Sequence, residues 1–266
     1  MEVHKVETGE DIRINMLVYG LTGVGKTTFL GSAQDCPATS PALLVDVEGG
    51  SLSLSGSDID VFRPTNFTQI QELYDFVRFE NTSYRSVLVD SITEIQRNLS
   101  MGGILRGPEN DTNYNDLANY TPPDRYDWLS SGEQMRRFIR AFRDLAYCEE
   151  KERRVHVFFS ALEKTDDVRS NVCPSLPGLL GVEIGASLDV LGRLSVQRVT
   201  VGEDEEEKEL RNLLLHERTD DDGIHYLAKM RKPLASAFPT EMWNPTVAKV
   251  LALWAEGTKK RRSKRV

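Results

Sequence analysis

The chain has 266 residues, of which 39% are hydrophobic and 28% are charged, and its formal net charge is −8. This length suits one large core, and no apolar run reaches the roughly 18 residues that a membrane-spanning helix needs. The net charge excludes a basic field over the whole molecule, although residues 259–265 are almost entirely basic and residues 203–209 form an acidic run.

Apolar runs alternate with helical patterns along the chain, which is typical of an α/β fold with a mostly parallel central sheet flanked by helices. The expected strands lie at residues 14–19, 42–47, 86–90, 155–161, 190–201 and 211–217, the last two as an antiparallel C-terminal meander. The expected helices lie at residues 26–34, 68–81, 132–151 and 246–255, with one more directly after residue 90. Ser91 with Glu94, and Ser131 with Gln134, have the spacing of capping boxes at helix starts.

Two polar segments interrupt this alternation, and we expect residues 102–127 and residues 163–185 to be long loops. We assign residues 1–256 to a single domain and residues 257–266 to a basic tail without regular structure.

The N-terminal residues are mixed polar and show no signal-peptide pattern. Cys36, Cys148 and Cys173 lack the spacing of metal ligands and cannot all pair, so we expect free thiols in a reducing compartment. The sequence therefore favours a cytoplasmic protein with no membrane contact.

A phosphate-binding motif lies early in the chain. Gly20 to Thr27 reads G-x-x-x-x-G-K-T, between an expected strand and an expected helix. Backbone N–H groups of such a loop wrap the phosphates, the lysine reaches the β- and γ-phosphates, and the hydroxyl binds Mg²⁺. The nucleotide-contacting residues that the motif predicts are Gly20, Thr22, Gly23, Val24, Gly25, Lys26, Thr27 and Thr28.

Two acidic positions follow apolar strands. Asp90 ends the run Val87-Leu-Val-Asp, and in P-loop proteins an aspartate at this place holds Mg²⁺ through its water shell. Glu48 follows the second strand in Asp46-Val-Glu, where a carboxylate can activate water beside the γ-phosphate. The same Asp-x-Glu pattern also fits a polar strand end that caps a loop.

Lys229 and Arg231 lie near the end of the expected meander, and alternation places both on one face of a strand. Such a pair could stabilise charge at the γ-phosphate of a neighbouring subunit. Two solvent-facing cations on a strand are the alternative reading.

Together these features resemble the RecA/DnaB branch of P-loop ATPases. In that branch the catalytic glutamate stands where Glu48 does, and the metal-binding strand typically ends Asp-Ser as in Asp90-Ser91. Its oligomeric members often insert a Lys-x-Arg or Lys-x-Lys pair into the adjacent subunit's site, which Lys229 and Arg231 resemble. Recombinases of the branch carry a glutamine after the strand at residues 155–161, where this chain has Ser160.

The segments GLTGVGKTTFL, LLVDVEGG, SVLVDSITEI and PSLPG further resemble phage-encoded, AAA-like nucleotide-binding proteins that consist of a RecA core alone. Some of these act in single-strand annealing or recombination. Over residues 12–232 the resemblance implies a RecA-like P-loop core that hydrolyses ATP with Mg²⁺. It also implies a homo-oligomeric ring or filament, single-stranded DNA as a partner, a single-strand-binding protein as a further candidate partner, and a bacterial or phage-infected cell.

The two expected loops occupy the positions of the DNA-contacting loops in that family. Aromatic side chains and cations on such loops suit stacking on single-stranded bases. The candidate DNA-binding residues are Arg106, Tyr114, Tyr120, Arg125, Tyr126, Lys164 and Arg169. Tyrosines that pin a loop to the body are the alternative.

Three other functions remain open. Glu163-Lys-Thr-Asp166 resembles the guanine-reading motif of GTP-dependent switches, although Asp90-Ser-Ile-Thr lacks the glycine of their switch motif. A small-molecule kinase would need an arginine-rich lid, which the central segments do not offer. A nucleotide-binding interaction module with negligible turnover fits the same motifs.

Overall fold

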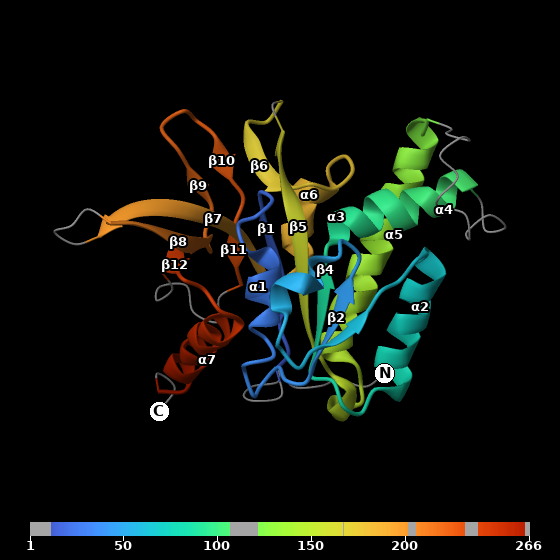
Figure 1. Ribbon diagram of the computed structural model, residues 1–266, viewed down its shortest axis with the longest axis horizontal. Helices are drawn as coiled ribbons and strands as arrows, with labels where there is room; N and C mark the ends of the chain where they lie inside the picture. The colour runs from blue at the N-terminus through green and yellow to red at the C-terminus, as the bar shows by residue number, and fades with distance from the viewer. Residues whose placement is uncertain (1–11, 107–121, 167, 202–205, 232–238, 264–266) are drawn as a thin grey trace.

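The computed structural model describes residues 12–106, 122–166, 168–201, 206–231 and 239–263 (Figure 1). Its strands are β1 Asn15–Gly20, β2 Ala42–Asp46, β3 Asp60–Phe62, β4 Ser86–Asp90, β5 His156–Asp166, β6 Asn171–Pro174, β7 Val190–Val201, β8 Glu206–Leu214, β9 Arg218–Thr219, β10 His225–Tyr226, β11 Lys229–Met230 and β12 Glu241–Trp243.

The helices of the described residues include short 3-10 and π turns alongside regular α-helices. The α-helices are α1 Lys26–Gly31, α2 Phe67–Asp75, α3 Ile92–Glu94, α4 Met101–Arg106, α5 Arg125–Asp144, α6 Leu180–Glu183 and α7 Val247–Ser263. The 3-10 turns are η1 Gly50–Leu54, η5 Leu145–Tyr147, η6 Lys151–Arg153 and η7 Ile184–Ser187, and the π turns are η2 Phe76–Glu80 and η3 Ile95–Ser100.

The main sheet has the order β12-β8-β7-β1-β5-β4-β2-β3. Neighbouring strands from β7 to β3 run parallel, whereas β8, β12 and β11 join by antiparallel pairing. The expected α/β fold, with a mostly parallel sheet, flanking helices and an antiparallel C-terminal meander, is therefore confirmed.

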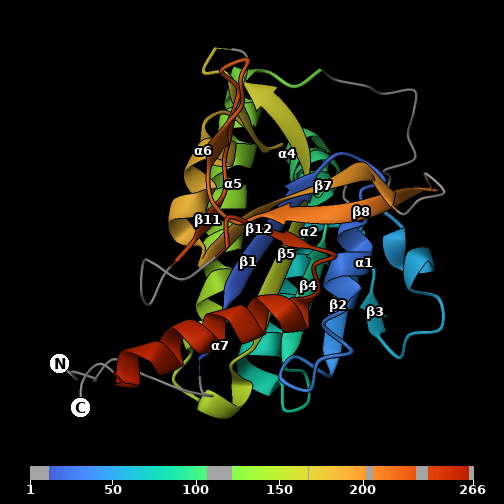
Figure 2. The ribbon, with the colours of Figure 1, turned by 90° about the vertical axis from the view of Figure 1, so that its left-hand side faces the viewer.

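Strict alternation in the buried strands builds a core on each face of the sheet. Leu17 and Tyr19 of β1 pack with α2, η3 and α5, while Met16 and Val18 pack with α1 and α7. Figures 1 and 2 show α2 and α5 together on one side of the sheet and α7 on the other. Because the strands are buried on both faces, their sequences read as continuous apolar runs, which is what made them predictable.

Helix α5 begins seven residues earlier than we expected from the Ser131/Gln134 pair (Arg125 against residue 132). Its N-cap is Asp124, whose carboxylate accepts the backbone N–H groups of Tyr126 and Asp127 at 2.6 and 2.9 Å, while Asp127 accepts the N–H of Asp124 at 2.8 Å. This closed capping box stabilises the helix start, so Arg125 and Tyr126 lie in a helix and not in a loop. Ser131 is a buried mid-helix residue that bonds to Gln96.

The second expected loop, residues 163–185, is largely regular structure. Strand β5 continues to Asp166 and pairs antiparallel with β6, so Lys164 lies opposite Cys173 in a hairpin. The prediction of a loop was wrong because β5 extends beyond the part of the sheet that is buried on both faces. Its sequence there changes from apolar to polar. In Figure 1 this hairpin projects above the sheet beside β9 and β10.

The C-terminal helix is also longer than expected. Helix α7 runs to Ser263 and takes in most of the segment that we expected to be an irregular basic tail. Within the described residues, no helix is both long and apolar enough to cross a membrane. Cys36, Cys148 and Cys173 are buried free thiols, as expected.

Candidate nucleotide and magnesium site

The phosphate-binding loop sits at the carboxyl edge of the parallel sheet. Strand β1 ends at Gly20, which lies beside Leu162 of β5, and α1 begins at Lys26. Gly23 and Gly25 have φ of 81° and 93°, which only glycine adopts at little cost. Thr22 and Thr28 are exposed beside the loop, while Val24 is buried beneath it.

Lys26 is folded back over the loop and only 7% exposed. Its Nζ donates to the carbonyl oxygens of Gly20 and Leu21 at 3.1 and 2.8 Å. Burial lowers the pKa of Lys26, and the negative charges of Glu48, Asp90 and Glu163 oppose that shift. Phosphate oxygens of a bound nucleotide would replace the two carbonyls and favour the charged amine.

Asp90 joins the phosphate loop to the centre of the sheet. Its carboxylate is 1% exposed and accepts the hydroxyl of Thr27 at 2.5 Å and the hydroxyl of Ser160 on its other oxygen. Hydroxyl and carboxylate oxygens are the hard ligands that Mg²⁺ prefers, so these residues fit the metal of a nucleotide complex. A Cβ at Gly50 would lie 3.0 Å from Oδ2 of Asp90 and 3.1 Å from Oγ1 of Thr27, so the chain after β2 closes this site.

Glu48 lies next to this centre on the segment after β2. Ser91, the N-cap of α3, donates its hydroxyl to Glu48 Oε1. Partial burial raises the pKa of Glu48, as do the negative charges of Asp90 and Glu94, whereas the Ser91 hydrogen bond and the charge of Lys26 lower it. The net upward shift of the pKa makes the Glu48 carboxylate a stronger base than an ordinary glutamate, which suits a general base.

Asp46, the other carboxylate of the Asp-x-Glu segment, has a different place. It is 3% exposed and accepts backbone N–H groups of Gly49, Gly50 and Ser51 at 2.8, 3.0 and 3.2 Å. Asp46 therefore folds the turn that carries Glu48. The loop-capping alternative holds for Asp46, while Glu48 reaches the site.

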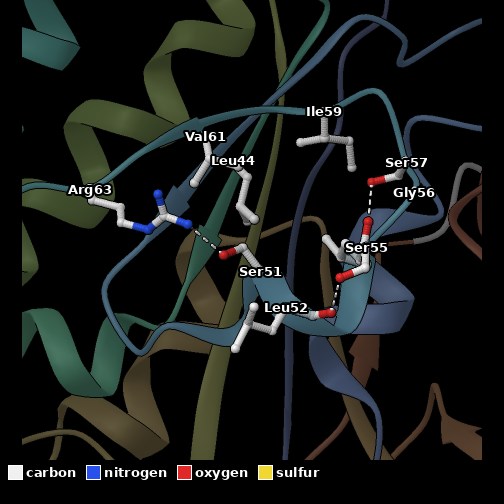
Figure 3. A pocket seen from close by; sticks show the side chains of 10 residues that line it. Leu44, Ser51, Leu52, Ser55, Gly56, Ser57, Ile59, Val61 and Arg63 are labelled. Atoms are coloured by element: carbon white, nitrogen blue, oxygen red, sulfur yellow. Dashed lines mark hydrogen bonds between the residues drawn. The ribbon is translucent and has the colours of Figure 1, made fainter.

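Arg63 supports the same turn from outside. Figure 3 shows its guanidinium donating to the Ser51 hydroxyl at 2.8 Å, and its Nε lies 3.6 Å from the Asp46 carboxylate. The residues around it line a pocket of about 240 Å³ between η1 and β3, to which Leu44 and Val61 contribute apolar side chains.

Two further ionic groups flank the loop. Glu163 accepts a bidentate pair of bonds from Arg193 at 2.8 and 3.2 Å, and that guanidinium lies 4.4 Å from the ring centre of Tyr226. On β8, Arg211 donates from Nε to the Val24 carbonyl at 3.2 Å.

Lys229 and Arg231 lie toward the amino ends of the parallel strands, because Lys229 pairs with Leu191 of β7 and the phosphate loop follows the carboxyl end of β1. Both have partners in their own chain. Lys229 donates to the carbonyls of Gly185 and Leu188 at 2.6 and 3.2 Å, and Arg231 lies 3.2 Å from Asp189. The structure does not bring this pair to the phosphate loop of its own chain.

The candidate DNA residues are dispersed. Tyr114 and Tyr120 lie outside the described residues, as does the side chain of Arg106, the last residue of α4. Arg125 and Tyr126 are exposed in the first turn of α5.

The two candidates on the β5–β6 hairpin already have bonds. Lys164 donates to the carbonyl of Leu176 at 2.5 Å, so its ammonium group is held by the chain itself, and Arg169 lies 2.9 Å from Asp166.

Fold and site together define a P-loop protein built to bind a nucleoside triphosphate. A family model described as "AAA domain" matches residues 12–231, so the chain belongs to this AAA domain family. A search of curated proteins finds no match. A solved structure titled "Crystal structure of the RadB recombinase" is similar at 14% identity with a TM-score of 0.42, covering 80% of this chain and 90% of that one.

Sequence reasoning missed the bond of Ser91 to Glu48, the bond of Ser160 to Asp90 and the contact of Arg211 with the phosphate loop. Ser160 left one signal, since a polar residue follows the apolar run Val157-Phe-Phe. Arg211 left none, because its contact with Val24 joins residues 187 positions apart.

Proposed function

We propose that this protein hydrolyses ATP with Mg²⁺. The observation that carries the proposal is the meeting of Lys26, Thr27, Asp90 and Glu48 at one edge of the sheet. Lys26 and Thr27 begin α1, Asp90 ends β4 and Glu48 follows β2. Together they supply what phosphoryl transfer requires: a cation for the phosphates, metal ligands and a base.

Each residue has a defined task in this reaction. Lys26 would neutralise the β- and γ-phosphates, and Thr27 and Asp90 would hold Mg²⁺, which would offset the charge that develops on the phosphoryl oxygens. Glu48 takes a proton from the attacking water, while the Ser91 hydrogen bond fixes its carboxylate. Gly50 keeps the space beside Asp90 and Thr27 free of a side chain.

Adenine is favoured over guanine as the base. The segment that resembles a guanine-reading motif lies in strand β5, where Glu163 is bonded to Arg193 and Asp166 to Arg169. Neither carboxylate is free to accept the N–H groups of a guanine ring.

We further propose that the ATPase acts as a RecA-like homo-oligomer on single-stranded DNA, in recombination or annealing of the phage type. Support comes from the resemblance of its motifs and from exposed Arg125 and Tyr126 at the start of α5, where Tyr126 is 75% exposed. An exposed aromatic ring can stack on the bases of a single strand, and an exposed cation can contact its phosphates. In such an oligomer Arg231 would stabilise charge at the γ-phosphate of a neighbouring subunit. This role requires that the ion pair between Arg231 and Asp189 break when the subunits assemble.

ATP turnover measured with and without single-stranded DNA tests both parts. We expect Mg²⁺-dependent turnover that Lys26→Ala abolishes, and DNA binding that weakens in Tyr126→Ala but not in Phe76→Ala, a control at another exposed aromatic. Nucleotide binding without turnover would favour the interaction module. Turnover without DNA retention at low salt would remove DNA from the proposal.

A further inference from the structure

Arg211 reaches the phosphate loop from a strand at the far end of the chain. Its Nε donates to the Val24 carbonyl at 3.2 Å, and a Cβ built on Gly25 would lie 2.4 Å from that Nε and 3.1 Å from Cζ. The guanidinium therefore lies directly on the loop, at the glycine whose left-handed conformation turns the chain into α1.

The backbone of Arg211 is fixed on both sides. Strand β8 pairs Arg211 with Val196 of β7, and the next residue, Asn212, pairs with Trp243 of β12. Asn244 donates its N–H to the Arg211 carbonyl at 2.7 Å. The pairing of the meander strands thus fixes the backbone that carries the guanidinium beside the loop.

Arg211 differs from other arginines of the meander in its charge partners. Arg193 pairs with Glu163, Arg198 with Glu209, and Arg231 with Asp189. Within the described residues, Arg211 is exposed and forms no ion pair, and the one hydrogen bond of its side chain uses Nε alone. Its two Nη groups thus remain available for an anion beside the loop.

The strand order indicates which part of a bound nucleotide would lie beside Arg211. Thr27, Asp90 and Glu48 lie on the β4 and β2 side of β1 and so define the side of the terminal phosphate. Arg211 lies on the opposite side, across β7. A nucleotide with its γ-phosphate at Asp90 would extend its α-phosphate and ribose toward β8.

We propose that Arg211 binds the phosphate nearest the nucleoside in ADP and ATP alike. This rests on the proposed ATPase function and deepens it. A guanidinium fork matches phosphate oxygens and remains charged at any working pH. Because ADP and ATP share this phosphate, and because it does not gain charge in hydrolysis, the contact contributes to affinity and leaves the chemical step unchanged.

The test compares Arg211→Gln and Arg211→Lys with Arg198→Gln, a control in the same β-ribbon. We expect Arg211→Gln to weaken Kd for MgADP and for MgATP by about tenfold each, with kcat at saturating ATP within about twofold of wild type. Arg211→Lys should recover part of the affinity, and Arg198→Gln should change nothing.

Melting without nucleotide separates binding from a purely structural role. Loss of the Val24 bond lowers the melting temperature of the nucleotide-free variant slightly. A binding role predicts in addition that MgADP raises the melting temperature of the variant by less than it raises that of wild type. Three outcomes in Arg211→Gln would overturn the inference. They are an unchanged Kd, a loss confined to kcat, and a lowered melting temperature of the nucleotide-free protein with normal nucleotide affinity. Should wild type itself bind no nucleotide, the ATPase proposal fails first; if only Lys26→Ala loses binding, the ATPase proposal stands and Arg211 is excluded.

Discussion

Asp46→Asn separates the two carboxylates of the segment after β2. Asp46 receives backbone N–H groups from Gly49, Gly50 and Ser51, the first two on one oxygen and the third on the other. Asparagine keeps one acceptor oxygen, loses the charge, and turns an NH₂ group toward the third donor or toward the first two. Hydrogen bonds to a charged group contribute about 1.5–3 kcal/mol each, so losing one and weakening two costs about 2–4 kcal/mol.

This loss has two measurable consequences. At about 2–4 °C per kcal/mol for a domain of this size, the melting temperature should fall by about 4–16 °C. Because the broken turn carries Glu48, kcat should also fall by about tenfold or more, even at temperatures where the protein stays folded. Thermal melts and steady-state ATP turnover on the same samples measure both.

Arg63→Gln is the matched control. It removes the outer ion pair to the same carboxylate, which is 3.6 Å long and has an arginine side chain that is 63% exposed. Such pairs contribute about 0–1 kcal/mol, so stability and turnover should change little. Wild-type stability and turnover in Asp46→Asn would refute the assignment of Asp46 to the turn.

The other predictions concern the groups nearest the phosphates. Glu48→Gln should bind ATP normally and melt like wild type, with kcat reduced about 10²–10⁴-fold; unchanged turnover would move the base to another residue. Since its pKa is raised, Glu48 loses its charge at higher pH than an ordinary glutamate. The acid limb of the kcat profile should therefore lie above the usual glutamate range, and a limb at about pH 4.5 would contradict this. Asp90→Asn should weaken Mg²⁺-dependent nucleotide binding, which a magnesium titration measures, and an unchanged titration would exclude it as a metal ligand. Lys26→Ala should abolish ATP binding or turnover, and full activity in this variant would contradict the phosphate-loop assignment.

The local parts of this protein were predictable because local sequence causes them. Buried parallel strands need apolar side chains on both faces, so β1, β2 and β4 appear as apolar runs ending near Gly20, Asp46 and Asp90. The phosphate loop needs glycine at left-handed positions and a lysine at its helix start. Because these residues are close together in the sequence, the motif can be recognised there directly.

Only tertiary structure decided what joins these segments. Which carboxylate of Asp46-Val-Glu48 folds the turn and which faces Ser91 depends on the pairing of β2 with β4. Lys229 and Arg231 fit a Lys-x-Arg pattern, yet the pairing of β11 with β7 places them beside carbonyls and Asp189 of their own chain. Arg211 meets Val24 because β8, β7 and β1 are neighbours in the sheet, and strand order is a property of the whole fold that no window of sequence contains.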